Sequence, residues 1–342
     1  MLLLLAAASA NELELNPWVL GQVWTTVYDQ DVADVADPAG YGDPEDDIGF
    51  KVRRARIGMT GTYGENLTYA VSVGMSSGAD AFSSGEEDVQ IIDAWADVKL
   101  TDLISTNFGV TKVPFGRENL ISSAEIPFQD RSVQSNHLAP RRDVGAVFDA
   151  NGGMWRLRLG AFNGNGSLLG DSDPAVLALA RAEAVIGEGD VYQTYGTVEG
   201  LTLGIAGDFA LNEEFSTRTL TYGGDVILRT GGLTAIVEYH RATITPTDAT
   251  VSTPDVFVQT TRWGGYAQVG YTMGIFQPVV RADIFDEDTS VEDNGDLLHI
   301  MAGVSTHLKD DRLRVGAGYQ HRMELGGADL PNSTARLWVQ FR

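Results

Sequence analysis

The chain has 342 residues, of which 43% are hydrophobic, and carries a formal net charge of −23 with no cysteine. The lack of cysteine excludes disulfides and thiolate metal sites, and the acidic balance argues against nucleic acid as a partner, because phosphate binding needs a basic face. No Pro-rich linker or low-complexity tract divides the sequence, so we expect one large unit rather than several domains.

The N-terminus begins with an apolar run from Leu2 to Ala8 and continues with Ser9 and Ala10. Small residues in this order are typical of the site that precedes signal-peptidase cleavage. We interpret residues 1–10 as the remnant of a secretory signal, with the mature chain starting at Asn11. The alternative is a short buried helix or strand.

From there on, hydrophobicity alternates with a period of two residues, which is typical of strands whose two faces meet different surroundings. The run 67–75, LTYAVSVGM, shows the pattern clearly. No stretch approaches the roughly 20 apolar residues of a membrane helix, whereas segments of about ten residues suit a tilted membrane strand. Sixteen such segments lie near 17–28, 50–62, 66–75, 90–99, 104–113, 143–150, 153–163, 190–198, 201–211, 218–230, 233–244, 258–272, 274–285, 296–308, 312–323 and 333–341.

The connections between these segments alternate in length. Those after even-numbered segments are tight, whereas nearly all of those after odd-numbered segments are long, with 212–217 as the short exception. Outer-membrane barrels have short periplasmic turns and long outer loops. The sequence therefore predicts an all-β fold over 11–342, a 16-stranded antiparallel transmembrane β-barrel with short periplasmic turns and long extracellular loops. A soluble solenoid or propeller is the alternative, but we find no fixed-period repeat.

One long connection, 164–189, contains a second expected element. Pro174 lies just inside its start and Gly187 follows its end, which is typical of a short helix over 173–187. We therefore expect a helix there and count 190–198 as the eighth strand.

The inward face of the predicted barrel is rich in arginine. Guanidinium groups stay charged and bind carboxylate or phosphate, so they favour anions in transit. Alternatively, they pair with lumen acids and pin an infolded loop to the wall, and both roles are compatible. The inward face carries Arg54, Arg56, Arg156, Arg158, Arg229, Arg262, Arg281, Arg312, Arg314, Arg322 and Arg336, with Asp93, Asp97, Asp225, Glu238, Asp283, His240, His299 and His307.

The connection 114–142 is the expected constriction. It is long and less acidic than the other outer loops, of which 29–49 is the most acidic. A pore of this width would leak unless a segment folded into it. We therefore expect an inward-folded loop at about 114–142, whose cations are Arg117, Arg131, Arg141 and Arg142.

Catalytic and metal-binding patterns are not evident. The sequence has no HExxH, GxSxG or P-loop motif, and its histidines are scattered. The acidic run 286–291 fails as an EF-hand because its sixth position, Val291, is not glycine. We therefore expect no enzyme activity, no catalytic residue, no metal and no cofactor.

Three stretches resemble the phosphate-selective porin O and P family. They are KVRRARI at 51–57, IDAW at 92–95 and GVTKVPFG at 109–116 followed by Glu118, and the likeness is clearest over 50–165. The resemblance implies a homotrimeric anion-selective porin of sixteen strands. It also implies that Arg54, Arg56 and Lys112 line the pore. Strict alternation puts Lys112 on the outer face, so it reaches the pore only if its strand bends into the loop.

These observations together predict an outer-membrane porin for passive diffusion of small solutes, surrounded by lipid and lipopolysaccharide. The lysines are few, namely Lys51, Lys99, Lys112 and Lys309, so we expect a modest preference for small anions rather than strict phosphate specificity. We further expect Arg54 and Arg56 to govern selectivity more than the acids of 29–49. The alternative function is a structural or adhesion barrel whose loops bind a partner, with little or no conductance.

Overall fold

The structure is a computed structural model in which residues 13–29, 49–76, 89–128, 130–166, 176–214, 216–247, 258–293, 295–326 and 333–342 are described. The proposed signal remnant, residues 1–10, lies outside these residues. The same holds for 30–48, which contain nearly all the acids of the 29–49 connection.

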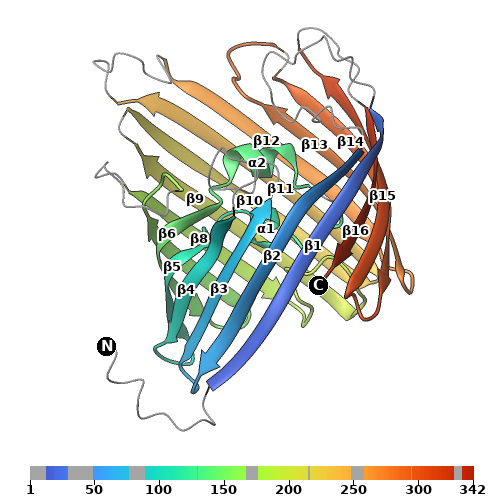
Figure 1. Cartoon of the computed structure of the whole chain (residues 1–342). Coiled ribbons are helices and arrows are strands. Elements are labelled where there is room, and N and C mark those ends of the chain that lie inside the picture. The colour runs from blue at the N-terminus through green and yellow to red at the C-terminus, as the bar shows by residue number, and fades with distance from the viewer. Residues whose placement is uncertain are drawn as a thin grey trace.

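Sixteen antiparallel strands form one closed barrel in which β1 pairs with β16, as the sequence predicts (Figure 1). Within the described residues, none of the helices is both long and apolar enough to span a membrane. The strands are β1 (Leu13–Asp29), β2 (Gly49–Tyr63), β3 (Leu67–Ser76), β4 (Gln90–Lys99), β5 (Ile104–Lys112), β6 (Arg142–Asn151), β7 (Trp155–Phe162), β8 (Leu177–Ile186), β9 (Val198–Glu213), β10 (Thr217–Gly231), β11 (Leu233–Pro246), β12 (Thr260–Tyr271), β13 (Phe276–Asp286), β14 (Leu297–Leu308), β15 (Leu313–Glu324) and β16 (Thr334–Phe341). Two short helices, α1 (Arg117–Leu120) and α2 (Val133–Leu138), lie between β5 and β6.

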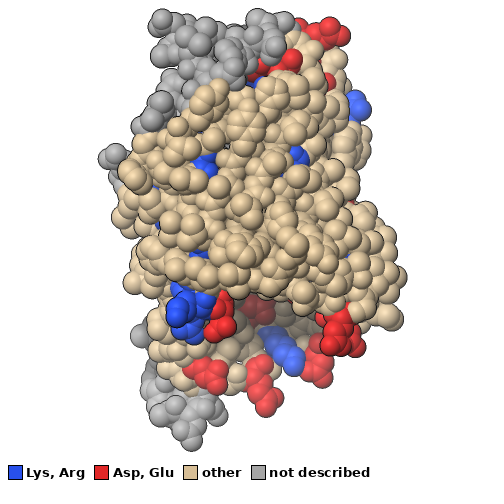
Figure 2. Space-filling model, turned by 90° about the vertical axis from the view of Figure 1, so that its right-hand side faces the viewer, with Lys and Arg blue, Asp and Glu red and all other residues tan. Residues whose placement is uncertain are grey.

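The two faces of the wall differ in polarity as the alternation predicts. Outward side chains are apolar, for example Ile57, which is 62% exposed, and Val237, which is 55% exposed. Inward neighbours such as Glu238 and Arg229 are buried. Figure 2 shows a broad middle band in which charged side chains are sparse, whereas they gather toward the two ends. This band is the apolar belt that a barrel presents to lipid.

A β-bulge in β2 changes which side chains face the lumen. Gln22 of β1 pairs with Arg54 and Val23 pairs with Val52, so Arg53 is the extra residue between them. Arg53 and Arg54 are therefore both buried, although they are adjacent in sequence. A bulge interrupts the two-residue period, which is why alternation alone assigned only Arg54 to the lumen.

The eighth strand is not where the sequence predicts it. The structure has β8 at 177–186, so the predicted helix over 173–187 is wrong for these residues. Of the predicted strand 190–198, residues 190–197 belong to a connection and only Val198 lies in a strand, β9. In β8 the alternation runs between alanines facing outward and larger or charged residues facing inward, such as Leu179 and Arg181. Alanine favours helices in isolation, but pairing with β7 and β9 outweighs this propensity.

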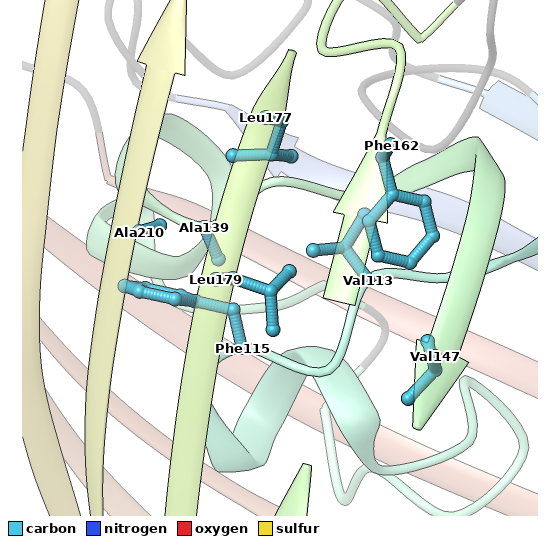
Figure 3. Close-up of a cluster of buried hydrophobic side chains, with 8 residues drawn as sticks. All are labelled: Val113, Phe115, Ala139, Val147, Phe162, Leu177, Leu179 and Ala210. Atoms are coloured by element: carbon cyan, nitrogen blue, oxygen red, sulfur yellow. The ribbon is translucent and has the colours of Figure 1, made fainter. Parts of the chain in front are cut away.

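The described residues of 113–141, here called the inner loop, lie inside the barrel between β5 and β6. Their Val113, Phe115 and Ala139 are buried against apolar side chains of the wall. Figure 3 shows Val113 beside Phe162 and Phe115 beside Leu179. Burying one such side chain stabilises the packed state by about 1.5–3 kcal/mol, so this cluster holds the loop against β6–β9.

The apolar belt yields a stability prediction. Val237 lies roughly 10 Å above the periplasmic end of β11, near the middle of a band roughly 25 Å tall. We expect Val237→Arg to lower the free energy of unfolding by about 2–4 kcal/mol, because it places a charge in hydrocarbon. The control Leu13→Arg, at the periplasmic end of β1, should cost about 0–1 kcal/mol. Urea unfolding in lipid vesicles measures both, and equal costs would contradict a lipid-facing belt.

Candidate functional site

Buried ion pairs attach the inner loop to the β8–β13 side of the wall. The Arg117 guanidinium lies 2.5 Å from an Asp225 carboxylate oxygen and 2.9 Å from one of Glu183. On the loop's other face, Arg281 of β13 lies 3.0 Å from a Glu118 oxygen. Each charge thus has a partner of opposite sign, which buried ions require.

Carboxylates also bind the backbone of the inner loop. Glu238 of β11 accepts hydrogen bonds from the Glu118 backbone N–H at 2.9 Å and from the Gln134 side-chain amide at 2.9 Å. The Glu118 carboxylate in turn accepts from the Ser132 backbone N–H at 2.8 Å. These bonds join α1, α2 and β11 into one unit.

A third attachment joins the loop to β2 and β16. The Asp130 carboxylate lies 2.7 Å from the Arg53 guanidinium, 4.0 Å from that of Arg54 and 3.9 Å from that of Arg336. Burial raises the pKa of Asp130, but these guanidinium groups outweigh burial and hold it below its ordinary 3.8. The ionised carboxylate therefore contributes its full stabilisation of the folded state at pH values above its ordinary pKa. This stabilisation is lost as the pH falls through the lowered pKa of the folded state.

The KVPFG stretch begins where β5 bends into the lumen. Pairing of β5 with β4 ends at Val110, whereas pairing with β6 continues to Lys112. The Lys112 ammonium donates to the carbonyls of Asn119 at 2.9 Å and Ile121 at 2.8 Å. Its cation thus lies beside the C-terminal end of α1, at the inner loop, and not on the lipid face to which alternation assigned it.

An outer cavity of about 260 Å³ lies between the inner loop and the wall at β6 and the β7–β8 connection. Its cations come from both the loop and the wall, and Asp143 is its carboxylate. The cationic and amide side chains that line it are Arg131, Arg141, Arg142, Asn119, Asn136 and Asn165.

An inner cavity of about 520 Å³ lies between the inner loop and the wall at β1, β2 and β4, and reaches the β14–β15 turn. Cations outnumber acids along its lining, where the carboxylates are Asp93 and Asp310. The cations are Arg56, Lys112, Arg142, Arg312 and Arg342.

Arg142 lines both cavities and is held by one carboxylate. Its guanidinium lies 3.0 Å from an Asp93 oxygen, and Ser72 donates to the other oxygen of Asp93 at 2.9 Å. Both members of the pair are partly exposed, at 15% and 18% of their side-chain surface. Both members of the pair therefore keep exposed surface at the inner cavity, and Arg142 also borders the outer one.

The predicted pore cations fall into two groups. Arg54 and Arg117 are fully buried, and each lies against groups that anchor the loop. Neither presents its guanidinium to a solute, because burial leaves no exposed surface. The other five border one or both cavities, and that they contact a permeating solute stays a prediction: Arg56, Lys112, Arg131, Arg141 and Arg142.

Sequence reasoning missed several charged groups of the lumen. Arg181 lies 2.7 Å from Asp208 and 2.8 Å from Asp225, but it falls within the predicted helix. Arg53 was hidden by the bulge. Arg342 lines the inner cavity from the C-terminus, where no alternation exists to assign a face. Among the described residues, no group of three or more His, Asp or Glu side chains is arranged to hold a metal ion.

The anchors yield a second stability prediction. Arg281→Ala leaves the carboxylates of Glu118 and Asp283 without their shared cation, and breaking a buried pair costs about 3–5 kcal/mol of unfolding free energy. Arg218→Ala is the control, because Arg218 and Glu213 form a half-exposed pair worth about 0–1 kcal/mol. Urea unfolding measures the free energy of unfolding of both variants. Similar losses in the two variants would show that the inner loop does not depend on Arg281.

Comparison with known proteins agrees with this geometry. The family model described as phosphate-selective porin O and P matches residues 26–183. No curated protein sequence matches the chain.

Several solved structures share the fold. The trimer form of OmpT, an outer membrane protein of Vibrio cholerae, aligns with a TM-score of 0.62 and 11% identity, covering 96% of this chain and 99% of its own. The anion-selective porin from Comamonas acidovorans aligns with a TM-score of 0.61 and 11% identity, covering 96% of this chain and 99% of its own. OmpF of Salmonella typhi aligns with a TM-score of 0.62 and 11% identity, covering 96% of this chain and 97% of its own. We conclude that the chain is a β-barrel of the bacterial outer membrane with the fold of the porins, and that its residues 26–183 match the phosphate-selective porin O and P family.

Proposed function

We propose that this protein allows passive diffusion of small solutes and that it modestly prefers anions, phosphate-like ones included. The observation that carries the proposal is the position of Arg142, which borders both cavities beside the inner loop. A solute that passes from one cavity to the other meets this guanidinium. Arginine stays charged at any relevant pH and binds carboxylate and phosphate through two parallel hydrogen bonds.

The local charge of the path supports an anion preference despite the net charge of −23. Selectivity is set at the narrowest part of a pore, where walls of low dielectric constant focus the field of nearby charges. Arg56, Lys112 and Arg142 lie together at the inner cavity, where Asp93 pairs with Arg142. Acids on exposed outer loops act less on the path, because salt screens them over about 8 Å.

A selectivity prediction follows from Arg142. A unit charge about 8 Å from a path through water changes an ion's energy by about 0.5 kcal/mol, which corresponds to a roughly twofold change in permeability. We therefore expect Arg142→Ala to lower the chloride-to-potassium permeability ratio at least about twofold. The reversal potential across a planar bilayer with a KCl gradient measures this ratio.

Arg156→Ala is the matched control. It removes a wall arginine that pairs with Asp149, and Arg156 borders neither of the two cavities described above. Its permeability ratio should stay close to that of the parent. If both variants shift equally, selectivity depends on the total lumen charge and not on Arg142. A protein that inserts but never conducts would instead favour the adhesion function.

We also propose that the chain assembles as a homotrimer. The support is the resemblance to porins and the likeness to the trimer form of OmpT from Vibrio cholerae. We expect a protein mass close to three times 36.8 kDa in mild detergent. Light scattering coupled to size-exclusion chromatography measures it, and a protein mass near 36.8 kDa would contradict the trimer.

A further inference from the structure

The connection between β8 and β9, residues 187–197, is unlike the other periplasmic turns. Connections such as 64–66 and 152–154 join their strands directly, whereas 187–197 folds into the barrel. Its Val191 and Thr194 are only 6% and 1% exposed. We call these residues the periplasmic strap.

Glycine conformation allows the strap to turn at both of its ends. Gly187 has φ +96° and Gly196 has φ +94°, which are left-handed values that side chains rarely adopt. A Cβ atom at position 187 would lie 2.2 Å from the Leu201 carbonyl oxygen. The chain therefore leaves β8 in a direction that only glycine permits.

The middle of the strap reaches the ends of β12, β13 and β14. The Gln277 amide of β13 donates to the Thr194 carbonyl at 2.6 Å, and the Gly196 N–H donates to the Thr272 hydroxyl at 3.1 Å. The Tyr195 ring stacks on His307 of β14 with centroids 3.5 Å apart and an interplanar angle of 2°. Because the strap joins β8 to β9, its middle must pass across the lumen near the periplasmic ends of β10–β12 to reach these strands.

The strap also packs against the inner loop. Arg117 donates to the Val191 carbonyl at 3.0 Å, and the Thr194 hydroxyl donates to the Glu125 carbonyl. The Val191 side chain lies in the same apolar cluster as Ile121 and Ile126 of the loop. The loop above and the strap below therefore form one packed layer.

An arginine of the barrel wall, Arg229, holds this packed layer in place. Arg229 of β10 donates to the carbonyls of Asp190 at 2.8 Å and Tyr195 at 3.0 Å, so one guanidinium binds both ends of the strap's middle section. The inner cavity lies on the other side of the inner loop, against β1, β2 and β4. The packed layer and this cavity thus occupy different parts of the cross-section.

We infer that the periplasmic strap is a size- and conductance-limiting element of this channel. Together with the inner loop it closes the β9–β14 side of the lumen, so that solutes pass along the side of Arg56 and Arg142. The inference rests on the proposed channel function. It assigns a permeability role to a segment at the periplasmic end, whereas the predicted constriction enters from the extracellular end.

The test releases the strap and measures its position and the conductance separately. Arg229→Ala combined with Gln277→Ala removes the hydrogen bonds to four strap carbonyls and leaves the strap sequence intact. Because the chain has no cysteine, Thr194→Cys provides a single thiol for a water-soluble maleimide. Arg322→Ala is the control, since it removes a lumen arginine paired with Glu324 and keeps the strap bonds.

We expect Thr194→Cys alone to be protected from the maleimide and the released variant to react. The released variant should also show a roughly twofold higher single-channel conductance, because current through a water-filled pore grows with its open cross-section. In liposome swelling it should admit larger neutral sugars, whose entry does not depend on charge. The control should match the parent in conductance and sugar uptake.

Each contrary outcome has a distinct meaning. Rapid labelling of Thr194→Cys in the otherwise unchanged protein would overturn the inference, because the strap would not be seated. Labelling of the released variant without any rise in conductance or sugar size would also overturn it. If the released variant stays protected from the maleimide, a second variant, in which two glycines replace residues 191–195, is measured. Unchanged conductance of that variant would also overturn the inference. Absence of current in all proteins would refute the channel function itself, whereas a conducting parent with unchanged variants refutes only the strap.

Discussion

The pairing of guanidinium and carboxylate groups across the interior is the interaction on which the pore depends. A closed ladder of sixteen strands fixes the wall, but it leaves a lumen too wide to discriminate among small solutes. Arg117, Glu118 and Arg281 fix the inner loop within this lumen through buried pairs. Such pairs add little net stability over an apolar core, yet losing one partner is costly, so they specify one position of the loop.

This pairing also distributes charge unevenly over the cross-section. On the β8–β13 side, acids such as Glu183 and Asp225 neutralise the arginines that they contact. On the β1–β6 side, Arg56, Lys112 and Arg142 border a cavity whose acids are fewer. Two roles are conceivable for the lumen arginines from the sequence. The structure shows the anchoring role at Arg117 and Arg281, whereas the role in the solute path is our proposal for Arg56 and Arg142.

The sequence predicts the barrel well because its period and its loop lengths are local properties. Sixteen strands, their closure and nearly all their positions follow from alternation between lipid and lumen. The prediction fails where a longer-range contact decides. β8 alternates alanine with inward residues, so only its pairing with β7 and β9 distinguishes it from a helix. The burial of Arg54 and Arg117 depends on Gln22, Asp130 and Asp225, which are distant in sequence. The bulge at Arg53 is equally invisible to alternation.

The central claim is that charge at the path, and not the total charge of −23, sets the selectivity. The most direct measurement is the reversal potential of the unmodified protein in a planar bilayer that separates two KCl concentrations. The account predicts a potential whose sign corresponds to chloride permeating faster than potassium. A potential of the opposite sign would contradict it, because the arginines beside the inner loop would then act only as structural anchors.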